Sequence, residues 1–404
     1  MAFRPTNMAG ARAMKRVLLV QPSLQPPGGS NGVAAWVLQA LVAEHRVTVL
    51  SWQPVEVAPI NRFFGTHLHG SDFDTIVVPR TWRFIPDRLP IPAALMKLAL
   101  LMRYTRKVSA GFDVVFGLHN ETDYGRRGIQ YIHYPSYLRP RPRVDLRWYH
   151  QPKAALAAYY ALADRVAGFS LDRMQANLTL VNSNWTGDRV RSFLGGSPRT
   201  LYPPVADPAP GLAWAERAPH FLAVGRISPE KDYERVMRIL ARVRAAAPHT
   251  QLTIVGTWDR HTAGYYRRLR SLARTLGDWT RFRHDASRDE LRQLMASHRY
   301  GLHAMGEEHF GMAPAEMARA GMIVWVPRGG GQVEVVGHEP ALLFTSDEEA
   351  AGKIVAVLAD PAAQDRLRHA LAAHAELFST DRFGREVREI VDAFPGERAV
   401  AALR

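Results

Sequence analysis

The sequence of 404 residues contains no cysteine. This absence excludes a disulfide framework, a thiolate nucleophile and a cysteine metal site, and it fits a reducing compartment. The sequence also has no apolar run near the roughly 20 residues that cross a bilayer. Its first apolar run, residues 17–20, is short and leads into a proline- and glycine-rich turn, which predicts a first strand rather than a signal peptide.

Acidic residues are scarce beside basic ones, with 38 Asp and Glu against 52 Lys and Arg and a net charge of +14. The excess is uneven, because residues 80–147 hold thirteen basic and five acidic residues. This predicts a basic face on the N-terminal half, suited to phosphates of a lipid carrier, a membrane surface or nucleic acid; the alternative is a solvated arginine-rich surface. The other proportions, 47% hydrophobic and 22% charged, are typical of globular domains.

The N-terminal half alternates short apolar strands with helices. A strand at residues 15–20 runs into a loop containing Gly28 and Gly29, and a helix follows. A strand, a glycine loop and a helix in this order let backbone N–H groups approach a phosphate or a sugar. We further predict a loop around residues 63–65, strands at 47–50, 75–78, 113–116 and 130–135, helices at 92–108 and 151–174, and a strand from 179 that ends at a helix cap, Ser183 or Asn184.

Ligands of doubly wound parallel folds bind at the carboxyl ends of the strands. His133 lies at such an end, so we predict a functional role, although a lone histidine is also often structural. Asp72 and Asp74 resemble a metal-binding pair, but they lead straight into a strand, and we predict a turn there. The apolar residues of 92–108 form more than one stripe, which favours core packing; the basic end of that helix leaves contact with anionic lipid open.

A second alternating pattern follows a Pro- and Ala-rich segment. The predicted fold class is therefore α/β, with two Rossmann-like domains facing a cleft. We assign residues 1–205 to the first domain, with 1–13 as a candidate disordered arm, 206–219 to a linker, 220–379 to the second domain, and 380–404 to a C-terminal helix that returns to the first domain.

Two carboxylates, Glu308 and Glu316, stand eight positions apart across a predicted loop-to-helix joint. Pro314 suits the first turn of that helix, and Gly321 suits its end. We predict that Glu316 lies in the first turn and that the N–H groups of residues 310–313 face a ligand. Two acids beside free donors suit a ligand with hydroxyls and negative charge, such as a sugar nucleotide; the alternative is a capping acid and a solvated loop acid.

The order and spacing of several short motifs resemble glycosyltransferases of the GT-B fold, specifically the large retaining family 4. The motifs are Gly225-Arg226 with Lys231, the acid pair within Glu308-His309-Phe310-Gly311, and Gly330-Gly331 to Glu334. Within that family, residues 131–135, 182–186, 202–204 and 308–311 look like those of eukaryotic dolichol-linked, GDP-mannose-dependent mannosyltransferases. We expect the chain to differ from these in having no amino-terminal membrane anchor, and it differs in the sequence of residues 136–140.

The resemblance implies roles for individual residues. It implies that Arg226 and Lys231 neutralise the donor diphosphate, that Glu308 holds sugar hydroxyls, and that His133 contacts the sugar near the reacting centre. It implies that Glu316 binds the ribose. The other implied donor-binding residues are Gly28, Gly29, Gly225, Gly256, His284, Phe310, Gly311 and Met312, and the candidate acceptor contacts are His119, Tyr134 and Arg139.

These roles predict a metal-independent, retaining hexosyltransferase that needs no cofactor. The favoured donor is GDP-mannose, with UDP- and dTDP-sugars open, and the acceptor is a glycan, a lipid-linked saccharide or a small molecule. We predict no nucleic-acid partner, and a cytoplasmic protein that contacts the inner face of an anionic membrane. Two alternatives share the fold: a sugar-nucleotide epimerase or phosphorylase, and a non-catalytic sugar-nucleotide-binding subunit.

Overall fold

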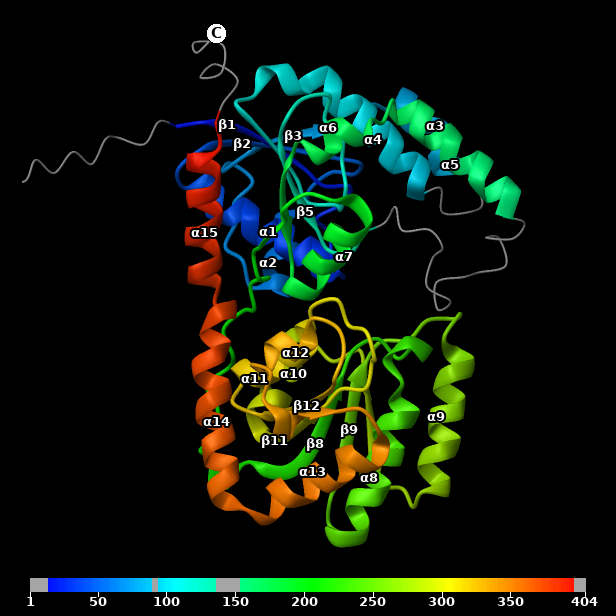
Figure 1. Ribbon diagram of the computed structural model, residues 1–404, viewed down its shortest axis with the longest axis vertical. Coiled ribbons are helices and arrows are strands. Elements are labelled where there is room, and N and C mark those ends of the chain that lie inside the picture. The colour runs from blue at the N-terminus through cyan, green and yellow to red at the C-terminus, as the bar shows by residue number, and fades with distance from the viewer. Residues whose placement is uncertain (1–13, 89–93, 136–152, 396–404) are drawn as a thin grey trace, which may run out of the picture.

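The computed structural model describes residues 14–88, 94–135 and 153–395. Figure 1 shows two α/β domains, one above the other, with α14 (Pro361–Ala375) and α15 (Thr380–Ala393) running along one side of both. Each domain is built on a single parallel sheet. The predicted fold class, α/β with two Rossmann-like domains and a returning C-terminal helix, is confirmed.

The first sheet has seven strands in the order β3-β2-β1-β4-β5-β6-β7. Its central strands consist almost wholly of buried apolar residues, as expected where helices cover both faces. The strands are β1 (Arg16–Val20), β2 (Arg46–Ser51), β3 (Asp74–Val77), β4 (Val114–Gly117), β5 (Ile129–Ile132), β6 (Leu178–Val181) and β7 (Arg199–Thr200). The helices of this domain are α1 (Gly29–Val42), α2 (Val57–Phe64), α3 (Arg80–Arg88), α4 (Ala94–Val108), α5 (Lys153–Ala167), α6 (Leu171–Gln175) and α7 (Asn184–Leu194).

The second sheet has six strands in the order β10-β9-β8-β11-β12-β13. These are β8 (Ala218–Val224), β9 (Leu252–Gly256), β10 (Thr280–His284), β11 (His298–Leu302), β12 (Ile323–Pro327) and β13 (Leu343–Phe344). The helices are α8 (Tyr233–Ala246), α9 (Ala263–Thr275), α10 (Arg288–Ser297), α11 (Met312–Arg319), α12 (Gln332–Val335) and α13 (Asp347–Ala359), before α14. Both sheets direct the carboxyl ends of their strands toward the space between the domains, where ligands of such folds bind (Figure 1).

The chain crosses between the domains twice, and the two crossings lie side by side. Val205 donates its N–H to the carbonyl of Phe378 at 2.8 Å, and Val205 and Ser379 form a parallel bridge. After the second crossing, α15 packs on α1, and Phe383 and Val387 enter the core of the first domain. The C-terminal helix is therefore part of the first domain, and both crossings must move together in any hinge motion.

Two local predictions were wrong, and one helix was not predicted. The residues around Phe63 and Phe64 are not a loop but the end of α2, which stops at Gly65 in the left-handed conformation, with φ of 74°. The long helix expected at 151–174 is two helices, because Gly168 has φ of 58° and Ser170 caps a new helix start. The helix α3 was not predicted; its Pro86 discourages that assignment from sequence alone.

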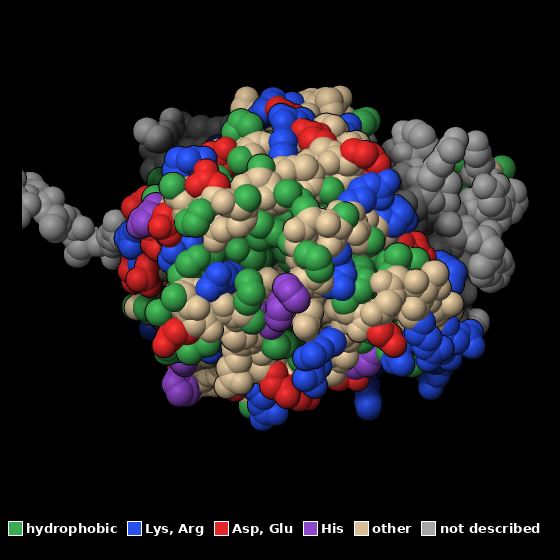
Figure 2. Space-filling view, turned by 90° about the horizontal axis from the view of Figure 1, so that it is seen from below, with side chains coloured by type: hydrophobic (Ala, Val, Ile, Leu, Met, Phe, Trp, Pro, Cys, Tyr) green, Lys and Arg blue, Asp and Glu red, His purple; other side chains and the backbone are tan. Residues whose placement is uncertain are grey.

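The surface charge of the second domain is mixed. Figure 2 shows the end of this domain opposite the first, where Lys and Arg side chains intermingle with Asp and Glu.

The predicted turn at Asp72 is confirmed, since its carboxylate accepts the N–H of His69 at 2.7 Å just before β3. Among the described residues, no helix is long and apolar enough to cross a membrane.

Candidate active site

The predicted acid pair lies on the loop after β11 and on α11 of the second domain. Gly311 caps α11 with φ of 106°, a value that favours glycine, and the helix begins at Met312. Glu308 lies on the loop before it, as predicted. Glu316 is the fifth residue of the helix, so the prediction of a first-turn position was wrong, and its carboxylate lies one turn beyond the helix start.

The backbone N–H groups at the start of α11 are available to a ligand. Within the described residues, no hydrogen-bond acceptor takes the amides of Phe310, Gly311 or Met312. A Cβ on Gly29, in the glycine loop of the first domain, would lie 3.6 Å from Cγ of Met312. The glycine loop of one domain therefore faces the helix start of the other, and this arrangement suits a diphosphate.

Two nitrogen atoms lie close to one carboxylate oxygen of Glu308, and only that of Lys231 makes a hydrogen bond to it within the described residues. Lys231, at the end of a 3₁₀ turn after β8, places Nζ 2.5 Å from Oε2 of Glu308, and both side chains are 17% exposed. His303, which follows β11, places Nε2 3.3 Å from the same oxygen. Burial alone would raise the pKa of Glu308, but His303 and Lys231 lower it well below its usual range. The carboxylate is therefore ionised at neutral pH.

Glu316 also has a cationic partner. Its Oε1 lies 2.6 Å from NH2 of Arg288, the first residue of α10, and both side chains are largely buried. The Glu316 carboxylate raises the pKa of the Arg288 guanidinium, because the two opposite charges meet away from bulk water. This pair fixes the orientation of the Glu316 carboxylate at the cleft.

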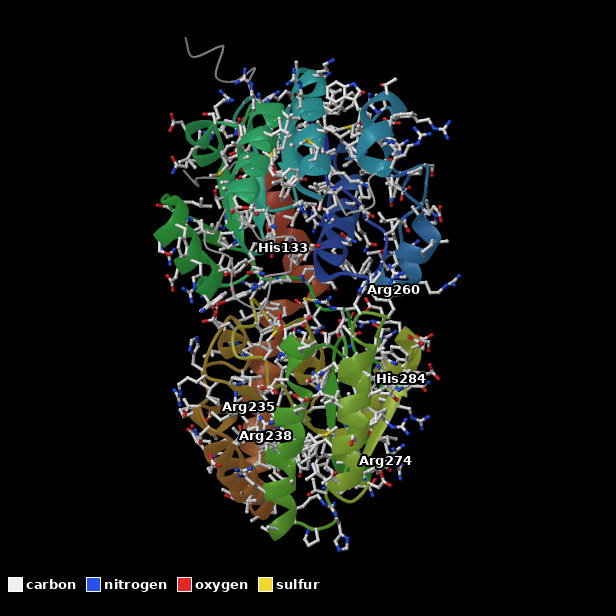
Figure 3. All side chains as sticks on the ribbon, turned by 90° about the vertical axis from the view of Figure 1, so that its right-hand side faces the viewer. His133, Arg235, Arg238, Arg260, Arg274 and His284 are labelled. Atoms are coloured by element: carbon white, nitrogen blue, oxygen red, sulfur yellow. The ribbon has the colours of Figure 1, made fainter. Side chains whose placement is uncertain are left out.

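His133 lies at the edge of the first domain that faces the second, as Figure 3 shows. Its Nε2 lies 3.1 Å from the carbonyl oxygen of Leu118, so Nε2 carries the proton and Nδ1 is an acceptor. Burial, and then the neighbouring His119, lower the pKa of His133 to about 3. His133 is therefore a neutral imidazole at every physiological pH, suited to hydrogen bonding with a hydroxyl rather than to carrying charge.

The other predicted donor residues lie around the same end of the second sheet. Gly225 has φ of 146°, and a Cβ on Gly256 would overlap the Gly225 carbonyl, so these glycines let two loops pack closely. Arg226 is exposed and bonds Glu230 at 3.1 Å. His284, labelled in Figure 3, bonds the Tyr266 hydroxyl at 2.5 Å at the end of β10.

The two domains are joined directly beside Glu308. Glu334 in α12 accepts the amides of Asn184 at 2.9 Å and Trp185 at 2.8 Å, at the start of α7 in the first domain. Ser183, the N-cap of that helix, donates its hydroxyl to the His309 carbonyl at 2.7 Å. The loop that carries Glu308 is thus fastened to the first domain.

The candidate acceptor contacts have different positions. The ring of Tyr134 stacks on that of His309, with centroids 4.0 Å apart and an angle of 11°, and so takes part in the junction of the domains. His119 is partly buried after β4, and burial lowers its pKa. Arg139 and the segment 136–140 lie outside the described residues.

A buried carboxylate of the first domain, Asp123, serves a structural purpose. It bonds Arg106 at 2.7 Å and Arg173 at 2.8 Å, and it accepts the amides of Gly125 and Ser170. All of its acceptor positions are thereby used. Within the described residues, no group of three His, Cys, Asp or Glu side chains could hold a metal ion.

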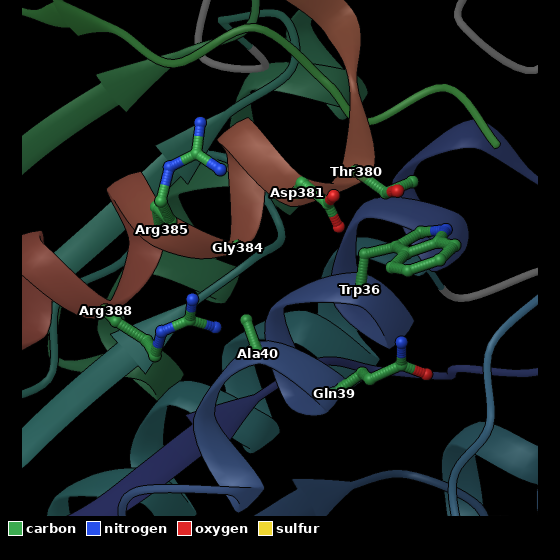
Figure 4. A pocket seen from close by; sticks show the side chains of 8 residues that line it. All are labelled: Trp36, Gln39, Ala40, Thr380, Asp381, Gly384, Arg385 and Arg388. Atoms are coloured by element: carbon green, nitrogen blue, oxygen red, sulfur yellow. The ribbon is translucent and has the colours of Figure 1, made fainter. Parts of the chain in front are cut away.

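A separate cavity of about 310 Å³ lies between α1 and α15 (Figure 4). Trp36 and Arg385 lie on opposite sides of it, from the two helices that pack there. It contains none of the residues that we predicted from the sequence.

Sequence reasoning missed the roles of His303 and Arg288 and the contacts that Ser183 and Glu334 make between the domains. Arg288 lies 28 positions before Glu316, and His303 precedes Glu308 in what reads simply as the end of a strand. No local pattern links these pairs. A histidine after an apolar strand on the same sheet edge as the acid pair was the one available signal.

Comparisons with known proteins agree with this architecture. Residues 209–376 match the family model described as glycosyl transferases group 1. A Dictyostelium discoideum protein named GDP-Man:Man(3)GlcNAc(2)-PP-Dol alpha-1,2-mannosyltransferase is 30% identical over 205 residues, which cover 46% of this chain and 41% of that protein. The human protein of the same name is 28% identical over 52% of this chain and 46% of its own length. The chain therefore spans less than half of each of these relatives.

Solved structures show the same fold over nearly the whole chain. Anabaena HepE in complex with UDP and glucose has a TM-score of 0.64 and 16% identity, and covers 94% of this chain and 100% of its own. WaaG, a glycosyltransferase involved in lipopolysaccharide biosynthesis, has a TM-score of 0.63 and 15% identity, with the same coverage. At these identities the likeness concerns the fold alone.

Proposed function

We propose, for a chain of the GT-B glycosyltransferase fold whose residues 209–376 match the glycosyl transferases group 1 model, that it transfers mannose from GDP-mannose to a hydroxyl of a glycan or lipid-linked acceptor. The observation that carries this proposal is the arrangement at the start of α11. Two fixed carboxylates, Glu308 and Glu316, flank unpartnered backbone N–H groups that face the glycine loop of the other domain.

Different groups of the site bind three different parts of a sugar nucleotide. The backbone N–H groups at α11, with Lys231 and Arg226, bind the diphosphate. Glu316, held by Arg288, accepts hydrogen bonds from the ribose hydroxyls, and Glu308 accepts them from the sugar. Neutral His133 receives a sugar hydroxyl at Nδ1, since its Nε2 is occupied by the Leu118 carbonyl.

The reaction breaks the bond between the anomeric carbon and the diphosphate oxygen, and the electron pair stays on that oxygen. Lys231, Arg226 and the helix start stabilise the growing negative charge, so the protein itself can supply the positive charge that a metal ion would otherwise bring. The acceptor hydroxyl forms the new bond on the face that the diphosphate leaves, and its proton passes to the departing phosphate oxygen. Configuration is thereby retained.

A double displacement would need a carboxylate nucleophile beside the anomeric carbon. Two carboxylates, Glu121 and Asp123, lie on the loop between β4 and β5 of the first domain, and both are buried. Asp123 already accepts hydrogen bonds from two arginines and two amides. We therefore favour front-side attack without a covalent glycosyl intermediate. Trapping with a 2-fluoro donor followed by mass measurement of the intact protein tests this; a stable adduct on a carboxylate would contradict it.

The donor is proposed from the names of the sequence relatives, which are GDP-mannose-dependent. Titration calorimetry with GDP, UDP and dTDP, and with their sugars, tests the base. We expect GDP to bind most tightly and GDP-mannose to bind more tightly than GDP. Preference for UDP would contradict the proposed donor, and incubation of the donor without acceptor, followed by analysis for an epimer, separates transfer from epimerisation.

We propose that the acceptor is presented at an anionic membrane surface on the cytoplasmic side. Support comes from α3 and α4, where Phe84 is 60% exposed and Arg88 lies 3.6 Å from its ring centre. An aromatic side chain beside arginines suits the interface of anionic lipid. Sedimentation with vesicles of phosphatidylglycerol, compared with phosphatidylcholine, tests this; equal binding to both, or binding unchanged by Phe84→Ser, would contradict it.

A further inference from the structure

The carboxylate of Glu308 is not held symmetrically. Lys231 and His303 both approach Oε2, at 2.5 Å and 3.3 Å, while Oε1 accepts no hydrogen bond within the described part of the chain. One oxygen is therefore fixed by the protein, and the other is left for a ligand.

The two donors differ in how firmly they are placed. His303 follows β11 directly, is 4% exposed, and donates its own amide to the Trp325 carbonyl on β12 at 3.0 Å. Lys231 ends a short 3₁₀ turn and reaches Glu308 through a flexible four-carbon side chain. The histidine is thus part of the sheet edge, whereas the ammonium group can reorient.

Diphosphate binding gives Lys231 a second negatively charged partner besides Glu308. A diphosphate carries more negative charge than a carboxylate, so Lys231 turns toward it once the donor enters. Glu308 then depends on its remaining donor. Without one, the carboxylate would rotate or lose its alignment with the sugar hydroxyls.

We propose that His303 is a positioning residue for the transferred sugar. Its Nε2 is buried, lies 3.3 Å from Oε2 of Glu308 and makes no hydrogen bond within the described residues, so it can donate to Oε2 once Lys231 serves the diphosphate and keep Oε1 directed at a sugar hydroxyl. This inference rests on the function proposed above. Burial lowers the pKa of His303, so the ring is neutral and donates a hydrogen bond without competing for the diphosphate. Recognition of the nucleotide sugar thus uses a mobile cation, Lys231, together with a fixed neutral hydrogen-bond donor, His303.

The test compares how His303 variants bind GDP and GDP-mannose. His303→Leu removes the hydrogen-bond donor beside Glu308, and His303→Gln restores an N–H near the position of Nε2. His303→Asn has the same amide on a side chain too short to reach Glu308. The control is His298→Leu, because His298 is a buried histidine at the other end of β11 whose partners within the described residues are the Leu294 carbonyl, Ser297 and Thr253.

We expect His303→Leu and His303→Asn to bind GDP within about twofold of wild type, but to lose about tenfold to a hundredfold of the preference for GDP-mannose over GDP, as expected for a hydrogen bond to a charged group. His303→Gln should keep most of that preference, and His298→Leu should keep all of it. The value of kcat should fall together with the preference.

Two results would overturn the inference while leaving the proposed function intact: an unchanged preference in both His303→Leu and His303→Asn, or an equal loss in His298→Leu. Wild-type protein that binds neither GDP-mannose nor another nucleotide sugar would overturn the proposed function, and this inference with it. Should wild type prefer uridine, the same ratio is measured with UDP and UDP-glucose. If His303→Leu fails to fold, the inference is tested by comparing the preference for GDP-mannose over GDP in His303→Gln with that in His303→Asn. An equal preference in these two variants would overturn it.

Discussion

The carboxylate of Glu334, in the second domain, lies 2.9 Å from the amide nitrogen of Asn184, the first residue of α7 in the first domain. An acid at a helix start is favoured by the positive end of the helix dipole. Here the acid comes from the other domain, so a helix cap also joins the domains beside the active site.

Replacement of Glu334 by alanine should weaken this junction. The change leaves the Asn184 and Trp185 amides without their acceptor, and the Tyr202 hydroxyl loses a 2.9 Å bond to the same carboxylate. We expect a loss of about 2–3 kcal/mol and a larger radius of gyration, measured by thermal unfolding and small-angle X-ray scattering. Glu339→Ala is the control, since its carboxylate accepts, within the part of the chain that the structure describes, a hydrogen bond from the nearby Ala341 amide alone. A compact Glu334→Ala protein of wild-type stability would contradict the prediction.

Replacement of Lys231 by alanine should reduce kcat far more than donor affinity. Its charge is needed most when the leaving diphosphate develops charge, so we expect kcat to fall about 10²- to 10³-fold. Steady-state kinetics with calorimetric donor affinity measures both effects. Lys353→Ala is the matched control, because Lys353 also pairs with a glutamate of its own domain, at 2.7 Å, but on α13. Unchanged kcat in Lys231→Ala would remove Lys231 from the mechanism.

Titration of the His133 ring should not contribute to the pH dependence of activity. Its pKa of about 3 keeps the ring neutral from pH 5 to 8, so its protonation state does not change in that range. We expect kcat/KM profiles of wild type and His133→Asn to have the same shape, with the variant lower by a constant factor. His133→Leu should be lower still, because asparagine keeps an acceptor near Nδ1. An inflection near pH 6.5 that disappears in His133→Asn would show that the ring titrates during turnover.

Asp123 should matter for acid stability rather than for chemistry. Its hydrogen bonds from Arg173, Gly125 and Ser170 lower its pKa despite burial. Because the folded-state pKa lies below the unfolded value, its stabilisation is present above about pH 4 and is lost as pH falls through the folded pKa. The difference in thermal stability between wild type and Asp123→Asn should be largest at pH 7 and shrink as pH falls below about 4. A difference that is as large at pH 3 as at pH 7 would contradict this.

Gly330 should tolerate no side chain. Its φ is 73°, and an added Cβ would lie 2.2 Å from the carbonyl oxygen of Glu308. Gly330→Ala therefore displaces the loop that carries Glu308, and we expect donor affinity to fall together with stability, by about 1–3 kcal/mol for the backbone strain alone. Gly352→Ala, in α13 with nothing within 4 Å of its Cβ position, should be neutral or stabilising. Wild-type donor affinity in Gly330→Ala would contradict this expectation.

The sequence by itself determined the alternation of strands and helices, the two parallel sheets, and the local joints. Ser183 as a helix cap, Pro314 in the first turn of α11, and the turn at Asp72 all depend on neighbours within a few residues. Such features follow from local backbone preferences and from the spacing of hydrophobic residues, and both can be read from short stretches of sequence. The motifs also carried the resemblance to GT-B glycosyltransferases, which the comparisons confirm.

Only the tertiary structure decided which partner each charged group has. Lys231 meets Glu308 across 77 positions, Arg288 meets Glu316 across 28, and Glu334 reaches Asn184 across 150. The position of α15 on the first domain and the break at Gly168 likewise depend on packing. The strength and geometry of an ion pair depend on distance in space and on burial, and neither quantity is encoded in local sequence spacing.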